Sequence, residues 1–96
     1  MNMQQGLETL RKTVIEKILQ CLEGTAPKEI FIELATILNK TPEIHTDRSL
    51  FKSYALLDFL SKQLTNGNQD LVSPEIVRES CTYLLSKLTP SEPYIS

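Results

Sequence analysis

The sequence predicts an all-α protein folded as an antiparallel four-helix bundle. Four separate segments carry hydrophobic residues at three- and four-residue steps, which is the repeat of a helix with one buried face. Glycine, proline and short polar residues lie between these segments, where helices end and begin. The sequence has no stretch of alternating hydrophobic and polar residues, so no sheet is expected. Short connections between helices of similar length favour antiparallel neighbours.

The first two helices are expected at residues 7–23 and from about residue 27 to residue 38. Gly24 is a natural end for the first helix, because glycine adopts the left-handed conformation without a Cβ penalty. Pro27 is tolerated in the first turn of the second helix, where the amide that proline lacks has no partner within the helix. Pro42 ends the second helix, because the residue before a proline avoids helical geometry.

The third helix is expected at about residues 50–65, after a polar connection at residues 42–49. Three residues can cap it: Thr46, Asp47 and Ser49. Hydrophobic residues surround much of its circumference, and such a helix is usually central to the core. The alternative is that its excess apolar face, with Phe51 and Phe59, binds a partner.

The fourth helix is expected at residues 74–88. Ser73 caps it, Pro74 fits its first position, and Glu75 complements the helix dipole. Pro90 then prevents its continuation.

A chain of 96 residues is long enough for one domain and not for two. We expect a polar N-terminal segment at residues 1–6, the four-helix bundle domain at residues 7–89, and a flexible tail at residues 90–96. The predicted core consists of apolar residues on the four helical stripes: Leu10, Val14, Ile18, Leu34, Leu38, Tyr54, Leu57, Leu60, Leu64, Val77, Cys81, Leu84 and Leu88.

The composition excludes several classes of function. The net charge is −2 with acids and bases interleaved, so no nucleic-acid partner is expected. The apolar runs are too short for membrane insertion, and residues 1–6 do not resemble a secretory signal. Cys21 and Cys81 lack metal-site spacing and fall on apolar helix faces, so we expect buried thiols and a cytoplasmic location.

The sequence carries no catalytic constellation, so the chain is not expected to be an enzyme. The single histidine, His45, lies in the polar connection without an identifiable acid–base partner. The three glycines are dispersed and do not form a phosphate-binding loop. The carboxylates Glu29, Glu33 and Glu43 do not form a carboxylate–histidine motif, so neither a metal nor another cofactor is expected.

Two segments carry a resemblance to a known family. The fourth helix opens with Pro74-Glu75-Ile76-Val77 and ends with Tyr83-Leu84-Leu85-Ser86-Lys87-Leu88, and the third contains Ser49-Leu50-Phe51. This pattern resembles the small cytosolic immunity proteins of bacteria that make pediocin-like (class IIa) bacteriocins. The resemblance covers residues 7–88 and implies an antiparallel four-helix bundle that protects the producer cell. It also implies a partner, a mannose-transport membrane complex held by the bacteriocin at the cytoplasmic side.

A second resemblance leads to an alternative. The run Asp47-Arg48-Ser49-Leu50-Phe51 is similar to the segment that precedes the prosthetic-group site of acyl carrier proteins. Those proteins attach phosphopantetheine to a serine that follows an aspartate. Here Lys52 precedes Ser53, so the resemblance implies an acyl-carrier-like domain without the attachment motif. A third alternative is a small secretion chaperone or adaptor that holds a partner helix in a groove.

In the immunity and chaperone alternatives the chain works by binding another protein, and the fourth helix with the tail is the predicted binding element. The polar face of this helix is suited to orienting a partner, and the tail offers an aromatic and an aliphatic anchor. The predicted partner-binding residues are Arg78, Glu79, Thr82, Lys87, Tyr94 and Ile95.

Overall fold

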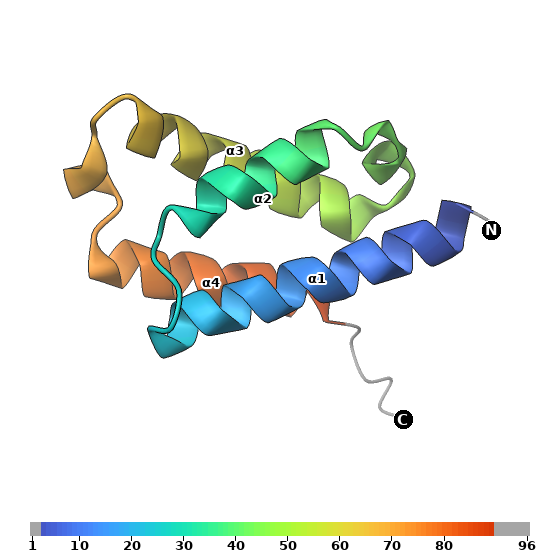
Figure 1. The fold of residues 1–96 in the computed structure, drawn as a ribbon, viewed down its shortest axis with the longest axis horizontal. Helices are drawn as coiled ribbons and strands as arrows, with labels where there is room; N and C mark the ends of the chain where they lie inside the picture. Colours follow the sequence, from blue (N-terminus) through green and yellow to red (C-terminus); the bar gives the residue numbers. More distant parts are fainter. Residues whose placement is uncertain (1–2, 90–96) are drawn as a thin grey trace.

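The computed structural model describes residues 3–89, with side chains from residue 6 onward. Its elements, in chain order, are α1 (Met3–Glu23), α2 (Ile30–Asn39), the 3₁₀ helix η1 (Pro42–Thr46), α3 (Arg48–Thr65), the 3₁₀ helix η2 (Gln69–Leu71) and α4 (Pro74–Leu88). Successive α-helices run in opposite directions (Figure 1). Within this described part there is no strand. The predicted all-α class and antiparallel four-helix bundle are therefore confirmed.

The helices pack as two pairs around one core. α2 lies mainly against α3 and α1 mainly against α4, while α3 and α4 join the two pairs along one side. The apolar stripes of all four helices face inward and form a single cluster. Its fully buried members of largest volume are Phe31, Ile18, Leu34, Leu38, Leu50, Leu57, Leu60, Leu84, Leu88, Val14, Val72 and Cys81.

The predicted starts of the first two helices are wrong. α1 begins at Met3, so most of the expected N-terminal polar segment at residues 1–6 belongs to the helix. This segment contains no proline, and methionine and glutamine are good helix formers, so the helix continues backward from Leu7. α2 begins at Ile30, because the amide of Ile30 donates to the carbonyl of Pro27 at 3.1 Å in a tighter turn than an α-helix makes.

Local capping signals are confirmed at the other two helices. The Asp47 carboxylate accepts a hydrogen bond from the Leu50 amide at 3.2 Å and caps α3. The Ser73 hydroxyl accepts one from the Ile76 amide at 3.2 Å and caps α4, with Pro74 at the first helical position.

Three residues of the predicted core lie outside it, and the structure adds eight buried hydrophobic residues to the predicted list: Leu7, Cys21, Ile30, Phe31, Ala35, Ile44, Leu50 and Val72. Leu10, Tyr54 and Val77 lie at its margin and are only partly buried. The Tyr54 hydroxyl donates to the Asn39 side chain at 3.0 Å, which holds the polar end of the ring at the surface. Ile44 is buried although it belongs to the connection expected to be polar. The η1 turn places this residue over the end of the core, next to α3.

A polar network joins α1 to the beginning of α3. The Arg11 guanidinium forms an ion pair with Asp47 and donates a hydrogen bond to the Ser49 hydroxyl. Ser49 in turn donates to Asp47 at 2.7 Å. Burial alone would raise the pKa of Asp47, but the hydrogen bonds from Ser49 and the Leu50 amide, together with the charge of Arg11, outweigh it and lower this pKa below 3.8. The capping carboxylate of α3 therefore also links α1 to α3.

Candidate protein-binding surface

An apolar groove of about 490 Å³ runs between α3 and α4 on the outside of the bundle. It is lined by Lys52, Ala55, Leu56 and Phe59 of α3 and by Glu79, Ser80 and Tyr83 of α4. We call these seven residues the α3–α4 groove. Both aromatic side chains of the groove are exposed to solvent, Phe59 to 54% and Tyr83 to 42%. Exposed aromatic residues beside a groove are typical of protein-binding sites.

The rotation of α3 explains why the groove is apolar. Leu50, Leu57, Leu60 and Leu64 occupy the face of α3 that the other helices cover. Phe59 projects about 100° away from Leu60, because successive residues turn by that angle in a helix. The expectation that the nearly continuous apolar circumference of α3 is core is therefore wrong for Phe59 and Phe51, which are exposed. For these two residues, the structure instead matches the alternative drawn from the sequence, in which the third helix has an apolar face beyond the one it buries.

Opposite charges flank the aromatic part of α4. Glu79 and Lys87 each lie four residues from Tyr83, on either side of it along the helix. The Lys87 ammonium lies 5.5 Å from the centre of the Tyr83 ring, within the range of a cation–π interaction. The α4 side of the surface is thus acidic before Tyr83 and basic after it.

The predicted partner-binding residues do not form one surface. Glu79 lines the α3–α4 groove, and Lys87 lies beside Tyr83 at its edge. Arg78 instead lines a pocket between α1 and α4, on another side of α4. Thr82 is exposed, and its hydroxyl donates to the Arg78 carbonyl at 2.9 Å within the helix.

The remaining two predicted residues, Tyr94 and Ile95, lie outside the described residues. The sequence prediction missed Leu56 and Tyr83 as groove residues. The excess of apolar residues on the third helix could have indicated Leu56, but it gives no signal for Tyr83, which lies on α4.

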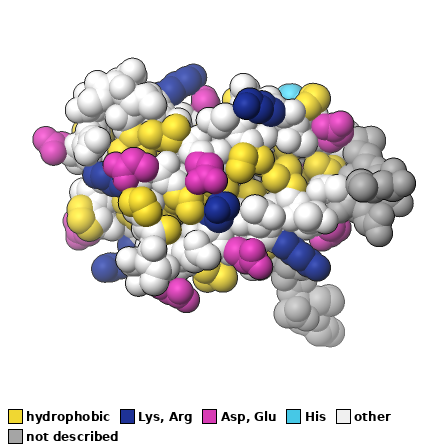
Figure 2. Space-filling view, viewed as in Figure 1, with side chains coloured by type: hydrophobic (Ala, Val, Ile, Leu, Met, Phe, Trp, Pro, Cys, Tyr) yellow, Lys and Arg dark blue, Asp and Glu magenta, His cyan; other side chains and the backbone are white. Residues whose placement is uncertain are grey.

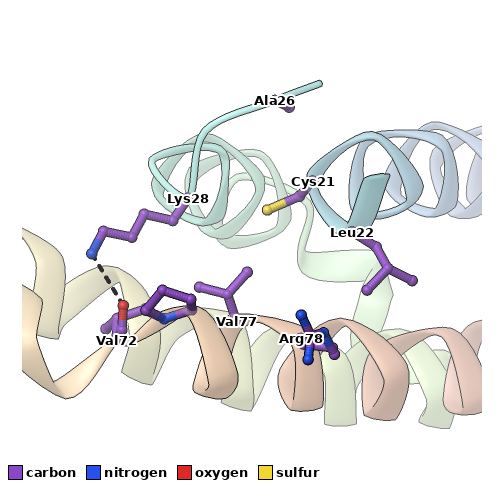
Figure 3. A pocket seen from close by; sticks show the side chains of 8 residues that line it. Cys21, Leu22, Ala26, Lys28, Val72, Val77 and Arg78 are labelled. Atoms are coloured by element: carbon purple, nitrogen blue, oxygen red, sulfur yellow. Dashed lines mark hydrogen bonds between the residues drawn. The ribbon is translucent and has the colours of Figure 1, made fainter. Parts of the chain in front are cut away.

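The pocket between α1 and α4 has a volume of about 340 Å³ and is shown in Figure 3. The Lys28 ammonium spans one end of it and donates to the carbonyls of Val72 at 3.1 Å and Gln69 at 3.3 Å. Lys28 therefore ties the connection between α1 and α2 to the connection before α4. Because these hydrogen bonds already occupy the ammonium, the pocket is a structural join between these two connections.

Cys21 lines this pocket, and its thiol lies beside that of Cys81 in the core. The Cys81 thiol donates to the Cys21 sulfur, and Cys21 donates to the Pro27 carbonyl at 3.9 Å. Both side chains are buried, as expected from the sequence. Burial and the neighbouring Cys21 raise the pKa of Cys81 to about 12, and burial also raises the pKa of Cys21. Such thiols remain protonated near neutral pH and are poor nucleophiles.

The titratable groups of the described part do not assemble into a metal site. His45 is exposed on η1, and its ring contacts Phe51 with the ring centres 4.8 Å apart. Over residues 3–89, no group of three or more histidine, cysteine or acidic side chains could hold a metal ion. In the same range, none of the helices has the length and hydrophobicity needed to cross a membrane.

Ser53 cannot serve as an attachment site in this arrangement. Its side chain is 0% exposed, and its hydroxyl donates to the Ser49 carbonyl at 2.8 Å inside α3. A prosthetic group is transferred to a hydroxyl that the transferring enzyme can reach, which is not the case here. The burial of Ser53 is thus a second reason, besides the missing aspartate, to expect no prosthetic group on this residue.

The face formed by α1 and α2 differs from the α3–α4 groove. Figure 2 shows hydrophobic side chains between these two helices, with acidic and basic groups interspersed among them. Lys17 of α1 and Glu33 of α2 form an ion pair across this face with nitrogen and oxygen 3.7 Å apart. Because the charges on this face alternate in sign and partly pair with each other, the face has no separate acidic and basic ends that would orient a partner.

Comparisons with known proteins do not add to this description, since no family model, curated protein or solved structure matches the chain.

Proposed function

We propose that this chain acts without catalysis, by binding another protein through the α3–α4 groove. The observation that carries the proposal is the exposure of Phe59 and Tyr83 on two neighbouring helices, both in the lining of one apolar surface. Aromatic side chains supply much of the binding energy at protein interfaces when a partner excludes water from them. Charged residues at the rim, such as Glu79 and Lys52, would set the orientation of the partner.

We further propose bacteriocin immunity as the cellular role, with a cytoplasmic location. The support is the resemblance of the third and fourth helices to pediocin-like immunity proteins, because these two helices also form the groove. The partner would then be a bacteriocin-occupied transport complex at the cytoplasmic side of the membrane. Binding from that side requires no membrane insertion by this chain.

The test is a protection assay in cells sensitive to a pediocin-like bacteriocin. Cells that express the full chain should survive bacteriocin concentrations that kill cells carrying an empty vector. Phe59→Ala and Tyr83→Ala should each lose most of this protection, because truncating a central aromatic residue commonly costs about 2 kcal/mol or more of binding energy, roughly a thirtyfold loss of affinity.

A matched control is Leu19→Ala, which removes a 40% exposed hydrophobic side chain from α1, outside the groove. All three variants should retain the helical circular-dichroism signal of the parent. Protection by the two groove variants equal to that of the Leu19 variant would refute binding through the groove. Failure of the unaltered chain to protect against any of several pediocin-like bacteriocins would refute the immunity role.

A secretion chaperone or adaptor is a second candidate, because the α3–α4 groove has the form of a site for a partner helix. Gene context separates the two roles. A neighbouring bacteriocin precursor gene favours immunity, and a secretion-apparatus operon favours the adaptor. The acyl-carrier alternative receives no support from the buried Ser53.

A further inference from the structure

The charges of the exposed α4 surface are arranged antisymmetrically about Tyr83. Glu79 precedes this residue by one helical turn and Lys87 follows it by one turn. Reversing the direction of the helix about Tyr83 therefore exchanges the acidic position with the basic one. A surface with this property is complementary to a reversed copy of itself.

We propose that in the free protein the α3–α4 groove is covered by a second copy of this chain, related to the first by a two-fold axis that passes beside Tyr83. This inference rests on the proposed function, in that it names an occupant of the same surface, which the other protein partner would displace on binding. In such a dimer the two α4 helices cross in opposite directions with the Tyr83 rings at the centre. Glu79 of each chain then faces Lys87 of the partner, so the interface has two equivalent ion pairs.

The α3 side of the groove is also complementary to itself under this two-fold rotation. Lys52 and Phe59 lie seven residues apart on one face of α3, with Ala55 and Leu56 between them. A two-fold axis through the middle of this stretch brings the Lys52 ammonium of one chain toward the Phe59 ring of the other. A lysine over an exposed aromatic ring is a favourable pairing. Both helices of the groove therefore present elements that pair under one axis.

The wider charge distribution agrees with this pairing. Arg48 stands one turn before Lys52, so the end of the surface that holds the start of α3 and the end of α4 is basic. Glu75 stands one turn before Glu79 and extends the acidic end. Lys62, near the acidic end, is already paired with Asp58 at 3.0 Å and adds little net charge there.

A partner of another kind would not require opposite charges at equal distances from one aromatic residue. An ion pair in a two-fold dimer does require it, because each contact in a symmetric dimer occurs twice with the roles of the two chains exchanged. A head-to-head arrangement, with the basic ends together, would bring like charges into contact and is disfavoured. The charge pattern thus favours a second copy that lies in the reversed direction.

The experiment measures the molar mass of the full chain by light scattering and sedimentation over a range of concentrations. The mass should rise from 10.9 kDa toward twice that value, with weaker association at high salt because rim charges are screened. Glu79→Lys and Lys87→Glu should each weaken dimerisation by about tenfold or more, since each places like charges together twice.

An equimolar mixture of these two variants is the decisive sample. One chain then carries two acidic positions and the other two basic positions, so the mixture should recover the parental dimer as a heterodimer. The matched control is Glu16→Lys on α1, which makes the same charge change on an exposed residue outside the groove and should leave the dimer intact. Circular dichroism should show the same helical content in every chain.

Three outcomes would overturn the proposal: a monomer at every concentration up to about 1 mM, single charge reversals without effect on the dimer, or a mixture that stays monomeric. The protection assay separates this proposal from the proposed function. If the chain is monomeric and its protection still depends on Phe59, the groove remains a binding site for another protein and the second copy is rejected as its occupant. A dimer that gives no protection would support the inference and reject the immunity role.

Discussion

Replacing Asp47 with alanine should destabilise the bundle at the junction of α1 and α3. The substitution removes the cap of the Leu50 amide and leaves Arg11 with only the longer ion pair to the exposed Glu8, at 3.9 Å. Loss of an N-cap costs about 1 kcal/mol. The ion pair is worth more than an exposed one, because its two side chains are only 16% and 17% exposed, so we add about 1–2 kcal/mol. The free energy of unfolding should fall by about 2–3 kcal/mol in total.

Urea unfolding monitored by circular dichroism measures this change, and two further variants divide it into its parts. Asp47→Asn keeps a capping side chain, so it should lose only the ion-pair share. A double-mutant cycle of Arg11→Met with Asp47→Asn should give a coupling energy of about 1–2 kcal/mol. A total cost below about 0.5 kcal/mol, or a cycle without coupling, would show that the network contributes nothing to stability.

The pH dependence gives an independent check on the same residue. The pKa of Asp47 is lower in the folded chain than its ordinary value of 3.8. The stabilisation is therefore complete above the unfolded pKa and is lost as the pH falls through the folded pKa. The stability difference between the parent and Asp47→Asn should be constant above about pH 5 and shrink below about pH 4. A difference that stays constant down to pH 2 would contradict the lowered pKa.

Four other predictions follow from single residues. Leu57→Ala should lower the free energy of unfolding by about 2–5 kcal/mol in urea, because Leu57 is fully buried, and a loss below about 0.5 kcal/mol would place it at the surface. Cys81, with a pKa of about 12 against 9.0 when unfolded, should react slowly with a disulfide reagent at pH 8 in the native chain, and its stabilisation should decline as the pH rises above 9.0; fast native reaction would contradict this. Mass spectrometry after incubation with a carrier-protein transferase should show no phosphopantetheine on Ser53, and a gain of that mass would restore the carrier alternative. Gly67→Ala should cost about 1–2 kcal/mol, because Gly67 has φ +82°, whereas Gly6→Ala, inside α1, should not destabilise; equal effects in thermal unfolding would exclude backbone strain.

The sequence was sufficient for features that depend on neighbouring residues. Ser73 and Pro74 begin α4 where a cap and a first-turn proline were expected, because both signals act within one helical turn. The same holds for Asp47, one of the three expected caps of α3. Ile44 was missed for the opposite reason. A single apolar residue in a polar connection has no periodicity, and its burial depends on η1 folding over the end of the bundle.

Exposure of the groove could not be predicted because it depends on how far each helix is rotated in the bundle. Phe31 and Phe59 both lie on strongly apolar helices, yet Phe31 is fully buried and Phe59 is more than half exposed. The two residues differ in which helices lie beside them, and this information is absent from the local pattern. The contact between Cys21 of α1 and Cys81 of α4 could not be predicted either, because it depends on which helices lie side by side.

The division of the predicted α4 surface follows from helix geometry. Arg78 and Glu79 are adjacent in sequence and both polar, so they were assigned to one binding face. Adjacent residues in a helix point about 100° apart, and α4 lies between α1 and α3. Arg78 therefore turns toward the α1 pocket while Glu79 turns toward the α3–α4 groove. Changes at Glu79 and Lys87 should thus affect one surface together, and a change at Arg78 should leave that surface unaltered.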